Sequence, residues 1–160
     1  MAPGYRLASD MAPGGGTSRA FDGQLPVGGI CLALSQLRWT VAACRNPDGG
    51  PIEIVWADGQ VTVLDTSPTN GITARSAAAN GAPADAQRAP AGTSIGHWER
   101  EELTSVNPFA RVAGARLTGV ALDHGLAPVP ERLTLRFNSA TVEVRVFRGE
   151  LQIGLGQHHR

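Results

Sequence analysis

The sequence has little of what would mark a secreted mini-domain, a membrane protein or a nucleic-acid-binding protein. Its 160 residues include two cysteines, and 14 acidic residues balance 14 basic ones. No apolar run approaches the ~20 residues of a membrane helix. A disulfide framework needs more cysteines, and a balanced charge creates no field that attracts a polyanion. We therefore expect a cytoplasmic chain without a membrane segment, in which Cys31 and Cys44 are reduced; a single bridge between them is the alternative.

The usual sequence signatures of catalysis and metal binding are missing as well. The chain contains no HExxH, GxSxG, Walker or CxxC spacing. His97 and Glu101 stand four residues apart, and Asp123 precedes His124, so either pair could be drawn as a general base and its partner. Neither pair has a nucleophile or a third metal ligand at a spacing typical of a catalytic or metal-binding motif. We expect no catalytic residue, no cofactor and no metal.

Lysine is absent, and all basic residues are arginines, which is typical of GC-rich bacterial coding sequences. Six arginines and three acidic residues fall between positions 111 and 148. Sheets that bind nucleic acid interleave such charges with exposed aromatic rings for stacking. Here Phe137 should point inward and Phe147 is the other aromatic residue. A solvated, salt-bridged face is therefore favoured over a nucleic-acid site.

The clearest feature that is present is an internal repeat. Residues 52–72 and 133–153 align without a gap at a spacing of 81 positions. Apolar residues alternate in both segments, and the aligned pairs are Ile52 with Leu133, Ile54 with Leu135, Trp56 with Phe137, Val61 with Val142, Val63 with Val144 and Ile72 with Ile153. A period of two predicts β-strands. Upstream, residues 38–41 resemble residues 116–120, so each copy should be a four-stranded meander.

This repeat predicts a mainly β fold with one or two short helices. Two pseudo-repeated four-stranded antiparallel meanders would pack as a sandwich or a partly open barrel. Residues 1–24 are rich in Gly, Ala, Pro and Ser and should form a disordered tail. Residues 25–160 should form one domain, with repeat 1 at about 37–75, a flexible connector at 76–94, a helix at about 95–106 and repeat 2 at about 113–156.

Three short segments decide how much helix accompanies the strands. Residues 94–106 place acidic residues in the early turns and offer Trp98 and Leu103 as apolar contacts, which predicts a helix. Phe109 to Val112 should form one further turn after a proline. The segment from Ile30 to Leu37 fits a short helix or a strand.

The turn in the first copy allows the facing of its strands to be predicted. Asp58-Gly59 suits a two-residue type I′ hairpin. With this pair at the tip, Trp56 would face Val61 on one side, and Val55 would face Thr62 on the other. The same register sets Glu53 opposite Leu64, whereas copy two would carry charged pairs such as Arg136 with Glu143 in the matching place.

This asymmetry gives the candidate binding site. Val55 and Leu64 would make the second face of copy one apolar, so that face should be covered. We take Val55, Leu64, Thr62 and Glu53 as candidate residues for binding another molecule. Cover by a segment of the same chain, such as Ile30 to Leu37, is the alternative.

Two resemblances bear on function. Residues 52–75 resemble the closing strands of the ASPIC/UnbV module of extracellular repeat proteins through a Trp-x-x-Gly hairpin and a Pro-x-Asn turn, but lack the His-Phe-Gly-Leu-Gly segment expected upstream. The ordered region is similar in layout to small two-copy actinobacterial proteins of immunity type. Asn107 to Val146 carries that pattern, with Gly-Ala-Arg-Leu-Thr-Gly-Val followed by Leu-x-Leu-x-Phe. This second resemblance implies a non-catalytic role in binding a partner.

The sequence therefore favours a non-enzymatic protein-binding module, of immunity type if the resemblance holds. Its partner would be another protein of unknown identity, or a second copy of the chain in a homodimer. The alternative is a small-ligand enzyme with a pocket between the two repeats, in which Cys44 and His124 form a thiol–imidazole pair.

Overall fold

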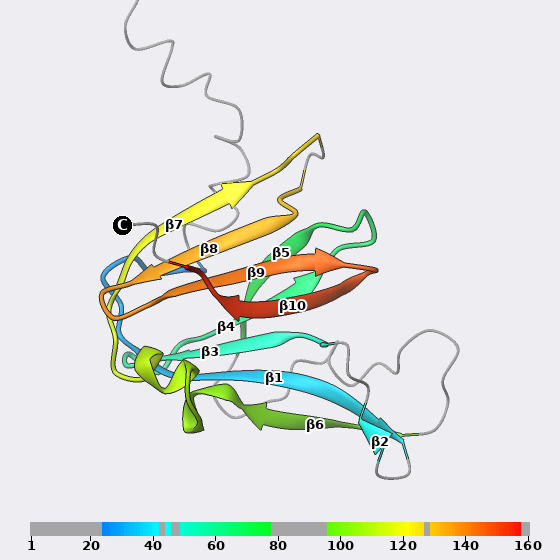
Figure 1. Cartoon of the computed structure of the whole chain (residues 1–160), viewed down its shortest axis with the longest axis horizontal. Helices are drawn as coiled ribbons and strands as arrows, with labels where there is room; N and C mark the ends of the chain where they lie inside the picture. Colours follow the sequence, from blue (N-terminus) through cyan, green and yellow to red (C-terminus); the bar gives the residue numbers. More distant parts are fainter. Residues whose placement is uncertain (1–23, 42–43, 46–48, 78–95, 127–128, 158–160) are drawn as a thin grey trace, which may run out of the picture.

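The computed structural model describes residues 24–41, 44–45, 49–77, 96–126 and 129–157, which form two antiparallel sheets packed face to face (Figure 1). In the first sheet the order is β2 (Cys44–Arg45), β1 (Cys31–Val41), β3 (Ile52–Trp56), β4 (Val61–Thr66) and β5 (Ile72–Ala77), and β6 (His97–Glu102) also pairs with β1. In the second sheet the order is β10 (Glu150–Leu155), β9 (Thr141–Phe147), β8 (Arg132–Phe137) and β7 (Leu117–Asp123). The sheets do not close into a barrel, so the predicted mainly β fold is confirmed as a sandwich.

The internal repeat is visible in the topology. Strands β1, β3, β4 and β5 follow one another as a meander, and β7, β8, β9 and β10 do the same. Both opening strands change register at the corresponding place, after Cys31 opposite Trp56 and after Leu117 opposite Phe137. Trp56 and Phe137 are both buried in the common core. The two copies therefore share strand order, a bulge and a large side chain at the end of the second strand.

The core lies between the two sheets and is built from alternate residues of each strand. Period-two alternation puts one side chain in two on the inner face, so burying these residues needs no special local structure. The first sheet contributes Leu34, Ile52, Ile54, Trp56, Leu64 and Ile72, and the second contributes Leu117, Leu133, Leu135, Phe137, Val142, Val144 and Leu151. Trp56 also donates a hydrogen bond from Nε1 to Thr62 Oγ1 at 2.9 Å, which satisfies its only polar group inside the core.

The predicted register of the first hairpin is wrong by one residue. Val55 pairs with Val61 rather than with Thr62, because the loop has three residues, Ala57-Asp58-Gly59, instead of two. The N–H of Gly59 bonds to the carbonyl of Trp56, and Gly59 has φ +86°. A tight turn followed by a left-handed glycine is the usual three-residue hairpin, which the Asp-Gly pair suits as well as a two-residue turn.

This extra loop residue turns β4 over relative to β9. In copy two the loop is two residues long, since the N–H of Phe137 bonds to the carbonyl of Ala140. Val142 and Val144 therefore face the core, but their sequence equivalents Val61 and Val63 face away from it. For the second hairpin, the prediction of a charged outer face is correct. The predicted cross-strand pairs are wrong, because Thr134, not Arg136, pairs with Glu143.

The outward face of the first sheet is nevertheless buried. Four apolar residues on it, Leu37, Trp39, Val61 and Val63, are at most 8% exposed, although none belongs to the core between the sheets. Trp39 packs edge-on against Trp98 of β6, with ring centroids 5.2 Å apart. The first sheet therefore buries side chains on both of its faces.

The helix predicted at about 95–106 is wrong, because His97–Glu102 forms strand β6. This segment pairs with β1 through cross-strand contacts that a helix could not make: Trp98 with Trp39, and Glu101 with Arg38. Gly96 precedes β6, and only glycine fits there, since a Cβ would lie 2.8 Å from the indole nitrogen of Trp39. Tertiary pairing thus overrides the local helix propensity.

Two 3-10 helices, η2 (Leu103–Ser105) and η3 (Phe109–Val112), link the sheets. Thr104 fixes η2 by accepting a hydrogen bond from the N–H of Leu34 at 3.2 Å. The predicted turn at Phe109 to Val112 is confirmed, and of the two readings of Ile30 to Leu37 the strand is correct.

The remaining predictions divide between the described and undescribed parts of the chain. Nearly all of the tail at 1–24 and of the connector at 76–94 lies outside the described residues, although Ser76 and Ala77 end β5. Within the described ranges, no helix is long and apolar enough to cross a membrane.

Candidate binding groove beside strand β10

The second sheet does not cover the whole inner side of β1 and β6. Along β1 the inward-facing residues change from Leu34 to Gln36 and then Arg38. Leu34 belongs to the core, while Arg38 lies opposite the edge of the second sheet and bonds to Glu101 of β6. The alternation continues without interruption, but its residues become polar where the covering sheet ends.

A groove opens at this boundary, between β10 on one side and β1, η2 and η3 on the other. Its volume is about 490 Å³, within the range of small binding sites. The apolar part of its lining comes from Leu103 and Phe109 on one wall and from Ile153 and Leu155 on the other. Phe109, Ile153 and Leu155 are only half-buried, although they pack against the core. We call this feature the β10 groove.

Arginines and one glutamate line the polar side of the β10 groove: Arg38 from β1, Arg132 from β8, and Glu143 and Arg145 from β9. Arg132 and Arg145 lie directly opposite each other on neighbouring strands. Like charges in that position repel, so the pair does not help the fold. In the described part of the chain Arg145 bonds to Gln152 at 3.1 Å, and neither arginine forms an ion pair.

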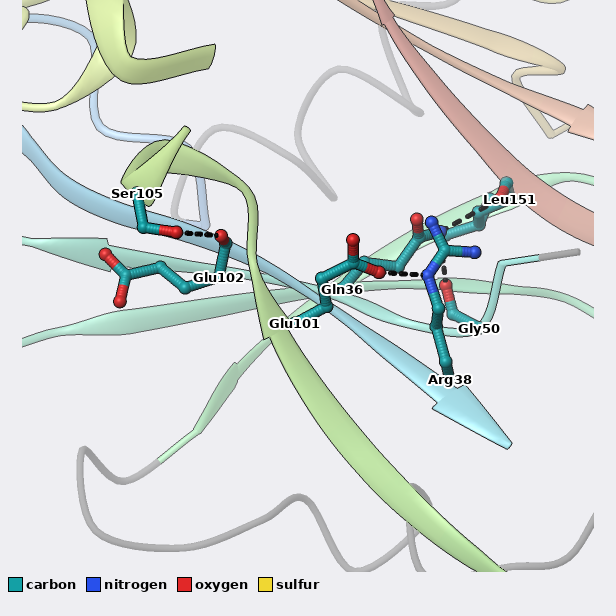
Figure 2. Close-up of polar contacts among 7 residues, drawn as sticks. All are labelled: Gln36, Arg38, Gly50, Glu101, Glu102, Ser105 and Leu151. Carbon is teal, nitrogen blue, oxygen red and sulfur yellow. Dashed lines mark hydrogen bonds and ion pairs between the residues drawn. The ribbon is translucent and has the colours of Figure 1, made fainter. Parts of the chain in front are cut away.

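Gln36 fixes one end of the groove. Its Nε2 donates to the carbonyl oxygens of Gly50 at 3.2 Å and Leu151 at 3.0 Å, which ties β10 to the first sheet (Figure 2). The N–H of Leu151 donates to the carbonyl of Gly49 at 3.2 Å. Gln36 is 2% exposed, so these bonds satisfy a buried amide. The start of β10 is therefore held rigidly against the first sheet.

Beyond Leu151, β10 is an open edge. The bonds of Leu151 to Gly49 and Gln36 show that its N–H and carbonyl point away from β9. Because these groups alternate along an antiparallel strand, those of Ile153 and Leu155 point the same way. Gly156 agrees with this alternation, since its N–H points to the β9 side and bonds to the carbonyl of Thr141. Among the described residues, Ile153 and Leu155 have no backbone partner on the open side.

The four residues predicted as a binding site are not one exposed patch. Leu64 and Thr62 face the core side of the first sheet and are 0% and 2% exposed. Val55 and Glu53 face outward, but Glu53 is 5% exposed and its carboxylate is bonded to Arg100 at 2.9 and 3.1 Å. The one-residue error in register is the reason that the sequence grouped them together.

The residues of the enzymatic alternative also lie apart. Cys44 belongs to β2 at the margin of the first sheet, and His124 follows β7 at the far margin of the second (Figure 1). No group of three His, Cys, Asp or Glu side chains able to hold a metal ion occurs in the described ranges.

Cys31 is buried with a free thiol. Val41, the partner of Cys44, lies ten positions along β1 from Cys31, which is about 33 Å of extended strand and far beyond disulfide reach. Burial raises the pKa of the Cys31 thiol to about 12, with a hydrogen bond to the carbonyl of Ala33 opposing the shift. A thiol that stays protonated is a poor nucleophile, so Cys31 is a core residue.

Sequence reasoning missed the β10 groove. The signal was present in β1, where Gln36 and Arg38 take inward positions after Leu34. Interpreting it requires knowing where the second sheet ends, which depends on packing between segments more than a hundred residues apart.

The chain matches no protein-family model, no curated protein and no solved structure.

Proposed function

We propose that this chain is a non-enzymatic protein-binding domain that takes its partner in the β10 groove. The observation that carries the proposal is the open half of β10, where half-buried apolar side chains meet backbone groups and two arginines that have no backbone or ionic partner among the described residues. Sheet edges of this kind are templates for another chain unless they are covered.

Two further features bear on the role and the location of the protein. The resemblance of Asn107 to Val146 to immunity-type proteins supports a role in neutralising a partner protein. The free thiol of Cys31 agrees with a cytoplasmic location, since structural disulfides are rare there. A second copy of the chain could occupy the same groove and give a homodimer.

The test is affinity capture by the full chain from its native host, followed by binding of the purified partner. The groove variant is Arg132→Glu/Arg145→Glu. The control is Arg136→Glu, which reverses a charge on the same outer face of β8 but outside the groove. We expect the groove variant to weaken binding at least about tenfold, with no change for the control.

Two results contradict this proposal. One is a purified partner that binds both variants equally well. The other is a self-association that sedimentation detects in the control and in the groove variant alike, with no heterologous partner captured.

A further inference from the structure

The edge geometry of β10 points to the kind of partner. Resting on the proposed function, we propose that the partner supplies an extended segment of alternating apolar and acidic residues, which adds to β10 as a fifth strand of the second sheet.

The backbone groups of β10 determine where the added strand lies. Leu151 is already bonded to Gly49 and Gln36, so the new strand begins beyond it. Ile153 and Leu155 each offer an N–H and a carbonyl on the open side, which gives four backbone groups to pair. Main-chain pairing of this kind supplies affinity without selecting a sequence.

The side chains around β10 determine the chemistry of the added strand. Its residues must alternate between the two faces of the sheet. On the inner face they meet Phe109 and Leu103, which form the apolar wall of the groove opposite β10. Apolar side chains fit this wall, because they would remove the half-buried side chains of Phe109, Ile153 and Leu155 further from water.

On the outer face the added side chains meet positive charge. Gly154 lies on this face, and no atom lies within 4 Å of the place where its Cβ would be, so the surface beside β9 is open. Arg145 and Arg132 follow on the next two strands at the row of Gln152. Guanidinium groups suit carboxylates, and a carboxylate here would offset the repulsion between the two arginines.

Glu143 sets a limit on this recognition. It lines the groove opposite Gly154 and lies two residues before Arg145 on the same face of β9. An acidic residue of the partner is therefore favoured near the Gln152 row and disfavoured beside Gly154. The added strand has one preferred register.

The experiment uses the full chain and synthetic peptides as probes. The first peptide alternates valine with glutamate over six residues, the second alternates valine with lysine, and the third is the glutamate peptide with an N-methyl group on every backbone amide. Amide resonances of isotope-labelled protein are followed during titration. We expect the glutamate peptide to shift and protect Ile153 and Leu155, with a Kd below about 1 mM.

The matched arms separate the two parts of the proposal. The lysine peptide, and the glutamate peptide on Arg132→Gln/Arg145→Gln protein, should bind at least about tenfold more weakly, because the carboxylate–arginine contacts are lost. The N-methylated peptide should not bind, because it cannot pair with β10. Leu155→Pro should also abolish binding, whereas Leu155→Ala should only weaken it, since alanine loses side-chain contact in the groove but only proline removes the outward N–H.

Specific outcomes overturn the proposal. They are no shift at Ile153 and Leu155 up to millimolar glutamate peptide, equal binding of the lysine peptide, or equal binding of the N-methylated peptide. If these occur while the native partner still needs Arg132 and Arg145, the β10 groove remains a binding site and only strand addition is wrong. If the native partner also ignores the arginines, the proposed function fails as well.

Discussion

The two sheets are built from copies of the same meander, yet the first buries both of its faces and the second buries only one. In copy two the outward residues of β9 are Glu143 and Arg145, whereas β4 turns Val61 and Val63 outward. The physical origin is the hairpin loop, which is one residue longer in copy one, because a shift of one residue reverses every side chain in a strand. Duplication alone therefore does not fix what a repeat exposes.

The two sheets therefore differ in what their exposed surfaces can do. On its outward side the first sheet places a tryptophan pair and the ion pair of buried Glu53 with half-exposed Arg100. The second sheet leaves a charged face and the free edge of β10. Substitutions at equivalent positions should consequently have very different effects in the two sheets.

The largest expected effect comes from charging an outward position of each sheet. Val63→Asp places a carboxylate at a site that is 0% exposed and should lower the free energy of unfolding by about 4 kcal/mol. Thr134→Asp on the outer face of β8 should cost less than about 1 kcal/mol. Urea unfolding measures both, and similar losses would mean that the two outward faces are not different.

A smaller effect should come from the ion pair on the first sheet. Glu53 is 5% exposed and bonds through both carboxylate oxygens to Arg100, so Arg100→Ala leaves a buried carboxylate without that partner. We expect a loss of about 2 kcal/mol, reduced by the half-exposed position of Arg100. Arg136→Ala in the second sheet is the control and should be nearly neutral; an equal loss there would contradict the comparison.

Alkaline pH should distinguish Cys31 from its counterpart in copy two, Leu117. The folded-state pKa of Cys31 is raised from 9.0 to about 12, so the thiol's contribution is complete below pH 9 and is lost as pH rises. Stability should fall by about 1.4 kcal/mol per unit above pH 9. Unfolding measured from pH 8 to 10.5 in a Cys44→Ser background should show this slope, and Cys31→Ala should remove it.

The smallest expected effect concerns the first hairpin loop, which is one residue longer than its counterpart in copy two. Gly59 has φ +86°, and nothing lies within 4 Å of its missing Cβ, so Gly59→Ala introduces only backbone strain. The expected loss is about 1 kcal/mol. Ser139→Ala in the two-residue loop of copy two removes one hydrogen bond to the carbonyl of Arg111 and controls for side-chain changes in a hairpin. A Gly59→Ala variant as stable as the parent protein would mean that the three-residue loop does not require a glycine at this position.

The fold could largely be predicted from the sequence, because alternating apolar residues and the spacing of 81 positions identify strands that must pair with their neighbours. Register could not be, since Asp58-Gly59 is compatible with loops of two and of three residues. Strand β6 was also missed: residues 97–102 have good helix propensity, and only the neighbouring edge of β1 makes them a strand.

The candidate site could not be predicted from the sequence for a related reason. Val55, Leu64, Thr62 and Glu53 were grouped through the incorrect register, whereas the β10 groove joins β1 to strands at the other end of the chain. Gln36 illustrates the difficulty, because its bond to Leu151 spans 115 positions. Such a contact leaves no local pattern.

The most direct test of the account is residue-resolved hydrogen exchange along β10 in the free protein. Gln152 and Gly154 are directed at β9 and should be protected, whereas Ile153 and Leu155 should exchange rapidly at the open edge. This alternation would establish that β10 offers a free edge to a partner. Uniform protection from Leu151 to Leu155 would show that the edge is already covered, and would contradict the proposed binding groove.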